Sequence, residues 1–199
     1  MSNIQLSKKA IFLDRDGTIS SDEYGYIRNP DDYNLYPYTG EALRILRSLG
    51  YLLFVVTNQS GVARGYFGIE NVQKVHARME DLIRKEGVCL DAVFFSPYFK
   101  EGIVEPFSIE HIDRKPGIGM FLQARERFCF RPEQSWMIGD RKSDIEFGCN
   151  AGLRTILLLS GNGRDEFVNS MHDWKIKPDF VVKDLLIAAH LISKLQKDV

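Results

Sequence analysis

Short apolar runs alternate along this chain with segments in which apolar residues recur every three or four positions. Continuous apolar runs are typical of strands covered on both faces of a parallel sheet, and they lie at residues 10–13, 51–56, 90–95, 135–138, 155–159 and, more weakly, 180–182. The periodic segments predict helices over about residues 40–49, 69–85, 116–128, 145–150 and 185–196. This alternation predicts an α/β fold with a single doubly wound, mostly parallel sheet flanked by helices.

Length and local signals refine this picture. A chain of 199 residues suits one domain, residues 1–199, without a large cap domain. Thr39 is expected to cap the helix over 40–49, Asp184 to cap the last helix, and Pro116 to begin the helix after residue 115. His76 lies off the apolar stripe of its helix, so we expect it on the surface.

Composition narrows the classes of partner. The formal net charge is −1, with acidic and basic residues interspersed, which favours a small-molecule ligand over nucleic acid or an anionic membrane. No apolar run approaches the roughly 20 residues that span a bilayer, and no signal peptide is seen. Three separated cysteines, Cys89, Cys129 and Cys149, are expected to be reduced and buried. We therefore expect a cytoplasmic monomer.

Polar clusters follow several of the predicted strands or lie just before the next helix. Asp14 and Asp16 come directly after the first strand, and Gly17 allows the backbone to turn tightly there. Three further clusters pair Thr57 with Asn58, Arg114 with Lys115, and Asp140 with Asp144. A parallel sheet brings its strand ends to one edge, where ligands bind. Crowded carboxylates are balanced by a hard divalent cation, which favours Mg²⁺. An isolated Asp-x-Asp is often only a solvated turn, so the interpretation depends on all four clusters together.

The motifs resemble those of phosphatases of the haloacid dehalogenase (HAD) superfamily, which share a Rossmann-like fold. The matching residues are Asp14-Arg15-Asp16-Gly17-Thr18, Thr57, Lys115 and Gly139-Asp140-Arg141-Lys142-Ser143-Asp144. Residues 12–19, 56–67 and 114–120 are more narrowly similar to the D-glycero-D-manno-heptose 1,7-bisphosphate phosphatases and the related histidinol-phosphate phosphatases. The resemblance extends from Lys9 to Leu195.

The resemblance implies a mechanism through an aspartyl-phosphate on a small sugar phosphate. Asp14 would attack the phosphorus, and Asp16 would act as general acid and then general base. Thr57 and Lys115 would hold the phosphoryl oxygens. Mg²⁺ would bind Asp14, Asp140 and the backbone carbonyl of Asp16, and Asp144 would position either Lys115 or a metal-bound water.

The resemblance also implies contacts with the rest of the substrate. The corresponding residues here are Asp22, Glu23, Tyr24, Gly25, Asn58, Gln59, Ser60, Arg114 and Arg141. Paired arginines suit a second phosphate, because their planar forks bind phosphate oxygens bidentately.

One segment departs from the family pattern. Related heptose phosphatases hold a structural zinc there with Cys-x-His and Cys-x-Cys pairs, and the matching positions are Ser96, Tyr98, His111 and Asp113. Because Ser and Tyr are poor zinc ligands, we expect no structural zinc. Packing is then expected to hold the loop, through Tyr98, Phe99, Ile103, Val104, Phe107 and Ile109. Because this loop borders the substrate in the family, the departure affects which substrate is expected to bind more than which reaction is expected.

Several alternatives remain open from the residues alone. Histidinol phosphate or another small metabolite could replace the heptose as substrate. A receiver-like phospho-acceptor domain also uses acids, a Thr, a Lys and Mg²⁺, but its acid pair precedes the phosphorylated Asp. A non-catalytic carbohydrate-binding relative would not need the intact acids. A polynucleotide 3′-phosphatase would need a basic surface, which the composition does not provide.

Overall fold

A computed structural model describes residues 8–21 and 25–197 of the protein. Its six strands form one sheet, and each pair of neighbours is parallel. The strand order is β3-β2-β1-β4-β5-β6, and the strands are β1 (Lys9–Leu13), β2 (Tyr51–Asn58), β3 (Ala92–Ser96), β4 (Trp136–Gly139), β5 (Arg154–Leu158) and β6 (Phe180–Val182). The predicted fold class is confirmed.

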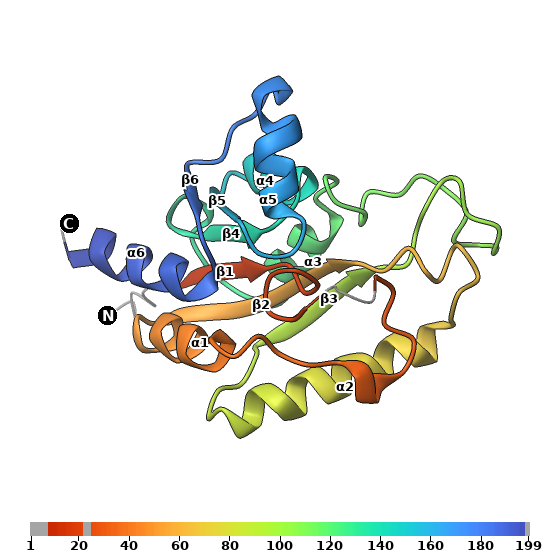
Figure 1. Ribbon diagram of the computed structural model, residues 1–199, viewed down its shortest axis with the longest axis horizontal. Helices are drawn as coiled ribbons and strands as arrows, with labels where there is room; N and C mark the ends of the chain where they lie inside the picture. The colour runs from red at the N-terminus through yellow and green to blue at the C-terminus, as the bar shows by residue number, and fades with distance from the viewer. Residues whose placement is uncertain (1–7, 22–24, 198–199) are drawn as a thin grey trace, which may run out of the picture.

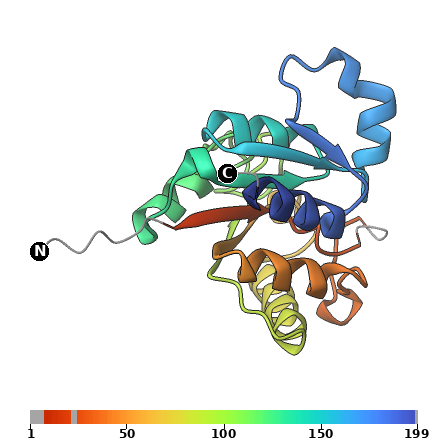
Figure 2. The same cartoon turned by 90° about the vertical axis from the view of Figure 1, so that its left-hand side faces the viewer.

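Helices cover both faces of this sheet (Figures 1 and 2). On one face lie α1 (Thr39–Ser48), α2 (Ile69–Lys85) and α6 (Leu185–Lys197), and on the other lie α3 (Gly119–Arg127) and α4 (Lys142–Asn150). Short helical turns complete the chain: η1 (Pro30–Asp32), η2 (Pro132–Gln134), α5 (Gly163–Asp165), η3 (Glu166–Ser170) and η4 (Met171–Asp173). The segment from α5 to η4 connects β5 to β6 and projects away from the sheet (Figure 1).

Alternation along β1 explains why both faces are packed. Ile11 and Leu13 enter the cluster under α1 and α6, whereas Ala10 and Phe12 enter the cluster under α3 and α4. The Phe12 ring lies 5.2 Å from that of Phe54 and 5.6 Å from that of Phe130, centroid to centroid. Truncating a buried Phe to Ala typically lowers the free energy of unfolding by about 3–5 kcal/mol. The strand that leads to Asp14 is therefore packed against helices on both of its faces.

Two local predictions about helix starts are wrong. Thr39 is the first residue of α1, and its Oγ1 donates a hydrogen bond of 2.8 Å to the Ile19 carbonyl instead of capping the helix. The side chain thus ties α1 to the turn after β1. The helix after residue 115 begins at Gly119 and not at Pro116, because the amides of Gly117 and Gly119 donate back to the carbonyls of Arg114 and Ile112. The predicted cap at Asp184 is confirmed by its Oδ1, which accepts from the Ile187 amide at 3.0 Å.

The predicted exposure of His76 and the predicted burial of the three cysteines are also wrong. His76 is 8% exposed, because its side of α2 packs edge-on against Phe95. Burial lowers its pKa to about 3. The three cysteines are free and exposed, since they lie in loops or on the outer side of a helix.

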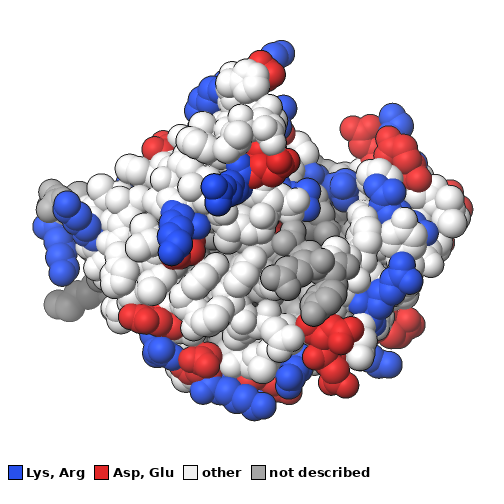
Figure 3. All heavy atoms as spheres, in the orientation of Figure 1, with Lys and Arg blue, Asp and Glu red and all other residues white. Residues whose placement is uncertain are grey.

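The described surface carries both signs of charge. Acidic and basic side chains are interspersed over the face in Figure 3. None of the helices in residues 8–21 and 25–197 is long and apolar enough to cross a membrane.

Candidate active site

The site begins where β1 lies between β2 and β4. Leu13 is in register with Val55 on one side and with Ile138 on the other. The Asp14 amide donates to the Ile138 carbonyl at 3.0 Å, so Asp14 extends β1 by one residue. The chain runs from β1 to β2 and β3 on one side, then crosses to β4 on the other side of β1, and a crevice opens in such sheets where the strand order reverses in this way. Asp14 therefore lies at the mouth of that crevice.

Lys115 connects three elements at this point. Its Nζ lies 2.6 Å from Oδ1 of Asp14, 2.6 Å from Oδ1 of Asp144 and 2.8 Å from the Val56 carbonyl. The Lys115 side chain is 2% exposed. Burial alone lowers the pKa of Lys115, but the two carboxylates outweigh it and hold that pKa above its ordinary value. Lys115 is therefore a buried ammonium whose three donors all have partners.

Asn58 holds the Lys115 backbone. Its Nδ2 donates to the Lys115 carbonyl at 3.1 Å, and its Oδ1 accepts from the Lys115 amide at 2.9 Å. The side chain at the end of β2 thus fixes a residue 57 positions later in the chain. The structure gives Asn58 a positioning contact that sequence reasoning did not identify.

The acidic cluster consists of Asp14, Asp140 and Asp144. These residues offer carboxylate oxygens within 4.8 Å of one another. Burial raises the pKa of Asp14 to about 7, with Lys115 acting in the opposite direction, and burial raises the pKa of Asp140 well above its usual range. Clustered carboxylates favour a hard cation with oxygen ligands.

The surroundings of the Asp140 carboxylate indicate whether the cluster fits such a cation. Its Oδ2 accepts from the Asn162 amide at 2.8 Å, while its buried Oδ1 has no hydrogen-bond partner among the described residues. A Cβ on Gly17 would lie 2.3 Å from Asp140 Oδ2, and one on Gly161 would lie 2.4 Å from it. Both glycines have positive φ, so this close approach requires glycine. The unpaired oxygen and its carboxylate neighbours fit Mg²⁺.

Asp16 is fixed separately from this cluster. Arg15 donates Nε to its Oδ1 at 2.9 Å and Nη2 to its Oδ2 at 2.8 Å. Gln59 Nε2 lies 3.0 Å from the same Oδ2 and 2.9 Å from Thr57 Oγ1, so it links the two side chains. The carboxylate of Asp16 is 23% exposed and does not belong to the acidic cluster.

A cleft of about 570 Å³ brings most of the predicted residues together. Its lining includes Asp14, Asp16, Gly25, Thr57, Asn58, Gln59, Ser60, Arg114, Lys115, Arg141 and Asp144. Predicted residues Asp22, Glu23 and Tyr24 lie outside the described residues. Sequence reasoning assigned no role to further lining residues, namely Tyr26, Arg64, Lys142, Glu146 and Glu166. Sequence signals existed for Arg64, which lies in the distinctive run 56–67, and for Lys142, which lies in the motif 139–144.

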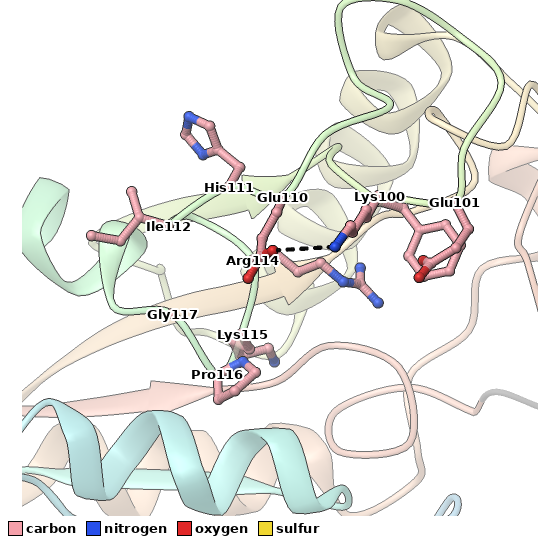
Figure 4. Close-up of a pocket in the computed structure, with 10 residues that line it drawn as sticks. Lys100, Glu101, Glu110, His111, Ile112, Arg114, Lys115, Pro116 and Gly117 are labelled. Atoms are coloured by element: carbon pink, nitrogen blue, oxygen red, sulfur yellow. Dashed lines mark ion pairs between the residues drawn. The ribbon is translucent and has the colours of Figure 1, made fainter.

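A second cavity of about 490 Å³ adjoins the cleft and shares Arg114 and Lys115 with it (Figure 4). The loop around it contains the positions that correspond to zinc ligands in related phosphatases. His111 stacks on Tyr98 with 3.8 Å between ring centroids, and His111 Nδ1 accepts from the Asp113 amide at 3.2 Å. Rings thus pack in this loop as predicted. Ile103 and Ile109 do not join that packing, being 81% and 43% exposed.

Comparison with known proteins places the chain in a family. Residues 112–188 match the model of the HAD-hydrolase-like family. The chain is 36% identical over 190 residues to D-glycero-beta-D-manno-heptose-1,7-bisphosphate 7-phosphatase of Pasteurella multocida, covering 95% of this chain and 99% of that protein. It is 41% identical over 155 residues to the protein of the same name from Haemophilus ducreyi, covering 77% and 84%.

A solved structure is similar over the same length. The D,D-heptose 1,7-bisphosphate phosphatase of B. bronchiseptica, crystallised with magnesium and phosphate, has a TM-score of 0.79 and 26% identity, with 96% of this chain and 99% of that chain covered. The protein is therefore a hydrolase of the HAD class. Within that class it belongs to the phosphatase family that contains the heptose-1,7-bisphosphate 7-phosphatases.

Proposed function

We propose that this protein is a Mg²⁺-dependent phosphatase that removes the 7-phosphate of D-glycero-D-manno-heptose 1,7-bisphosphate. One observation carries the proposal: Asp14 lies at the mouth of the cleft with its Oδ1 2.6 Å from the Lys115 ammonium, beside the Asp140 and Asp144 carboxylates. The names of the relatives support the choice of substrate. The magnesium and phosphate bound by the B. bronchiseptica protein support the choice of metal.

In this proposal Asp14 is the nucleophile. One of its oxygens bonds to the phosphorus while the bond from phosphorus to the sugar oxygen breaks, and Asp16 gives that oxygen a proton. Asp16 then takes a proton from a water molecule, whose oxygen bonds to the phosphorus as the bond from phosphorus to the Asp14 oxygen breaks, so inorganic phosphate leaves and Asp14 is regenerated. The Arg15 and Gln59 contacts hold the Asp16 carboxylate in place for both transfers.

Lys115 and Thr57 would stabilise the negative charge on the phosphoryl oxygens during transfer. Asp144 keeps Lys115 aimed at Asp14, since the same ammonium contacts both carboxylates at 2.6 Å. Asp14, Asp140 and the Asp16 carbonyl would hold Mg²⁺, which supplies positive charge against the carboxylates and the phosphate.

The rest of the substrate would contact the cleft walls. Gly25, Ser60, Arg114 and Arg141 line the cleft, and we assign them this role. Gln59 is already bound to Asp16 and Thr57, and Asn58 to the Lys115 backbone. We assign Asn58 and Gln59 a substrate contact only in addition to those bonds, and Asp22 to Tyr24 are proposed from the resemblance alone.

A phosphate-release panel tests the proposal. Heptose 1,7-bisphosphate, histidinol phosphate, smaller sugar phosphates and an aryl phosphate would be compared with Mg²⁺ and with EDTA. We expect release to be fastest from the heptose bisphosphate, and to vanish with EDTA and in Asp14→Asn. Asp31→Asn, in the η1 turn and outside the lining of the cleft, is the matched control and should behave like the wild type. Phosphate release that persists both with EDTA and in the Asp14→Asn protein would refute the mechanism.

The same panel decides between the substrates that remain open. Faster release from histidinol phosphate than from the heptose would replace the substrate and keep the chemistry. Binding of sugar phosphate without release by the wild type would instead indicate a non-catalytic relative.

A further inference from the structure

The loop that follows β5 lies against the acidic cluster. It contains Ser160, Gly161 and Asn162, and we call it the β5 loop. The Asn162 amide donates to Oδ2 of Asp140 at 2.8 Å, and the side-chain Nδ2 of Asn162 lies 3.4 Å from the same oxygen. Oδ1 of Asp140 has no hydrogen-bond partner among the described residues. The β5 loop thus occupies one oxygen of this carboxylate and leaves the other for a cation.

The same loop holds the turn after Asp14. Ser160 Oγ donates to the Gly17 carbonyl at 2.7 Å, and the Gly17 amide donates to the Ser20 carbonyl at 2.8 Å. These two hydrogen bonds fix the peptide units on both sides of Gly17. The first of these units also contains the Asp16 carbonyl, and because a peptide unit is planar, fixing its amide fixes the direction of its carbonyl. The turn therefore presents the Asp16 carbonyl in a defined orientation.

The β5 loop approaches both groups as closely as a backbone can. A Cβ on Gly161 would lie 2.4 Å from Asp140 Oδ2 and 2.5 Å from the Cα of Gly17. Gly161 has a φ of +52°, which side chains rarely adopt, so both the contact and the conformation require glycine. A displacement of the loop would therefore move the Asp140 carboxylate and the turn together.

Ligands that are held in place bind a cation at lower cost. The buried carboxylates of Asp14, Asp140 and Asp144 repel one another when no cation lies among them. Hydrogen bonds from neighbouring groups orient such ligands before the cation arrives, and their loss typically weakens metal binding about 10- to 100-fold. The β5 loop supplies hydrogen bonds of this kind from one short segment of the chain.

We propose that the β5 loop orients two of the proposed Mg²⁺ ligands and thereby sets the affinity of the site for the cation. It acts on Asp140 through the Asn162 amide, and on the Asp16 carbonyl through Ser160 and Gly17. This inference rests on the proposed function, which supplies the metal and its ligands. Ser160 and Asn162 are positioning residues, because each acts through another residue.

Calorimetric titration of metal-free protein with MgCl₂ tests the contact made by Ser160. For Ser160→Ala we expect the Kd for Mg²⁺ to rise about tenfold, because the hydrogen bond to Gly17 is lost. Ser160→Thr keeps a hydroxyl and should recover most of the wild-type affinity. Ser48→Ala is the matched control, since it removes an exposed hydrogen bond of the same length, 2.7 Å from Oγ to the Ile45 carbonyl, and should leave the Kd unchanged.

Two substitutions at residue 162 separate the backbone amide from the side chain. Asn162→Pro removes the amide donor at a position whose φ of −84° is close to that of proline. Asn162→Ala keeps the amide and removes only the side chain. We expect the Kd for Mg²⁺ to rise about 10- to 100-fold in Asn162→Pro. It should change little in Asn162→Ala, because the Nδ2 contact of 3.4 Å is long for a hydrogen bond.

Thermal melting distinguishes this role from a merely structural one. Each protein would be melted in EDTA and at one fixed concentration of Mg²⁺, and we expect the rise in Tm that Mg²⁺ gives the wild type to be smaller in Ser160→Ala and Asn162→Pro. A lower Tm in EDTA with an unchanged Kd for Mg²⁺ would overturn the proposal. If Asn162→Pro does not fold, Ser160→Ala and Ser160→Thr decide the outcome alone.

The same titration keeps this inference separate from the proposed function. Wild-type protein that binds Mg²⁺ in a Ser160-dependent way but releases no phosphate from any substrate would refute the phosphatase function alone. Wild-type protein that releases phosphate with Mg²⁺, together with a Ser160→Ala protein of unchanged Mg²⁺ affinity, would overturn the role of the β5 loop alone.

Discussion

Replacing Lys115 by Met removes one buried charge and keeps a side chain of similar length. In the folded protein that charge contacts Asp14 and Asp144 at 2.6 Å each and the Val56 carbonyl at 2.8 Å. Its loss leaves two buried carboxylates without their cation. Breaking a buried ion pair from one side typically costs about 3–5 kcal/mol of folding free energy. At about 2–4 °C per kcal/mol for a chain of this size, the melting temperature in EDTA should fall by about 6–20 °C.

The same substitution should slow the chemical step. The ammonium is placed to balance charge that grows on the phosphoryl oxygens during transfer, and removal of one such donor lowers kcat by about 10²- to 10³-fold. Calorimetric melting in EDTA and phosphate release at saturating substrate with Mg²⁺ would measure the two effects. Lys115→Arg should not restore kcat, because a planar fork cannot place three donors on these acceptors.

A surface lysine provides the matched control. Lys100 is 70% exposed and lies 3.8 Å from Glu110, so Lys100→Met should change the stability by less than about 1 kcal/mol. A Lys115→Met protein that melts like the wild type and keeps kcat within about threefold would refute the reasoning about this site. Destabilisation with unchanged kcat would show that the lysine serves folding only.

Three further outcomes are expected. Arg114→Ala should raise KM on a bisphosphate with a smaller change in kcat, since Arg114 binds ground and transition states alike; an equal loss on an aryl phosphate would place it in the chemical step. Elemental analysis of protein purified without added zinc should find well under one equivalent, and stoichiometric zinc bound through His111 and Asp113 would contradict this. Burial lowers the pKa of His76 to about 3, so its neutral form is favoured in the native state and stability should fall as the pH drops below the unfolded-state value of about 6.5. From pH 8 to pH 5 that loss is about 2 kcal/mol, and urea unfolding of His76→Leu should lack it; an unchanged pH slope would show that His76 titrates normally.

The sheet and its acidic edge could be predicted because each depends on a short stretch of chain. A run such as 51–56 is apolar at every position only if both of its faces are covered. Asp14 and Asp140 then follow from the geometry of parallel strands, whose ends meet at one edge. Asp144 was expected to support either Lys115 or a metal-bound water, and the 2.6 Å contact favours Lys115.

Contacts between distant loops could not be predicted in the same way. Arg64 meets Phe99 only because residues 102–104 dock on Ala63, and no local pattern encodes that docking. His76 was misplaced for a related reason, since the apolar stripe of α2 describes its contact with the main core and not the contact of its flank with Phe95.

The charges of the site show where a divalent cation would be needed. Arg15 is fully engaged with Asp16, and Lys115 is shared between Asp14 and Asp144. Asp140 forms no ion pair with a described side chain, although the charge of Arg141 acts on it, and one Mg²⁺ would balance the negative charge that remains between Asp140 and Asp14. The oxygen without a hydrogen-bond partner in the described part of the site is Oδ1 of Asp140. The carboxylate of Asp140 lies so close to Gly17 and Gly161 that neither position can hold a side chain. Because Arg15 and Lys115 are already engaged with Asp16, Asp14 and Asp144, the uncompensated charge is concentrated between Asp14 and Asp140, beside the oxygen that would attack phosphorus.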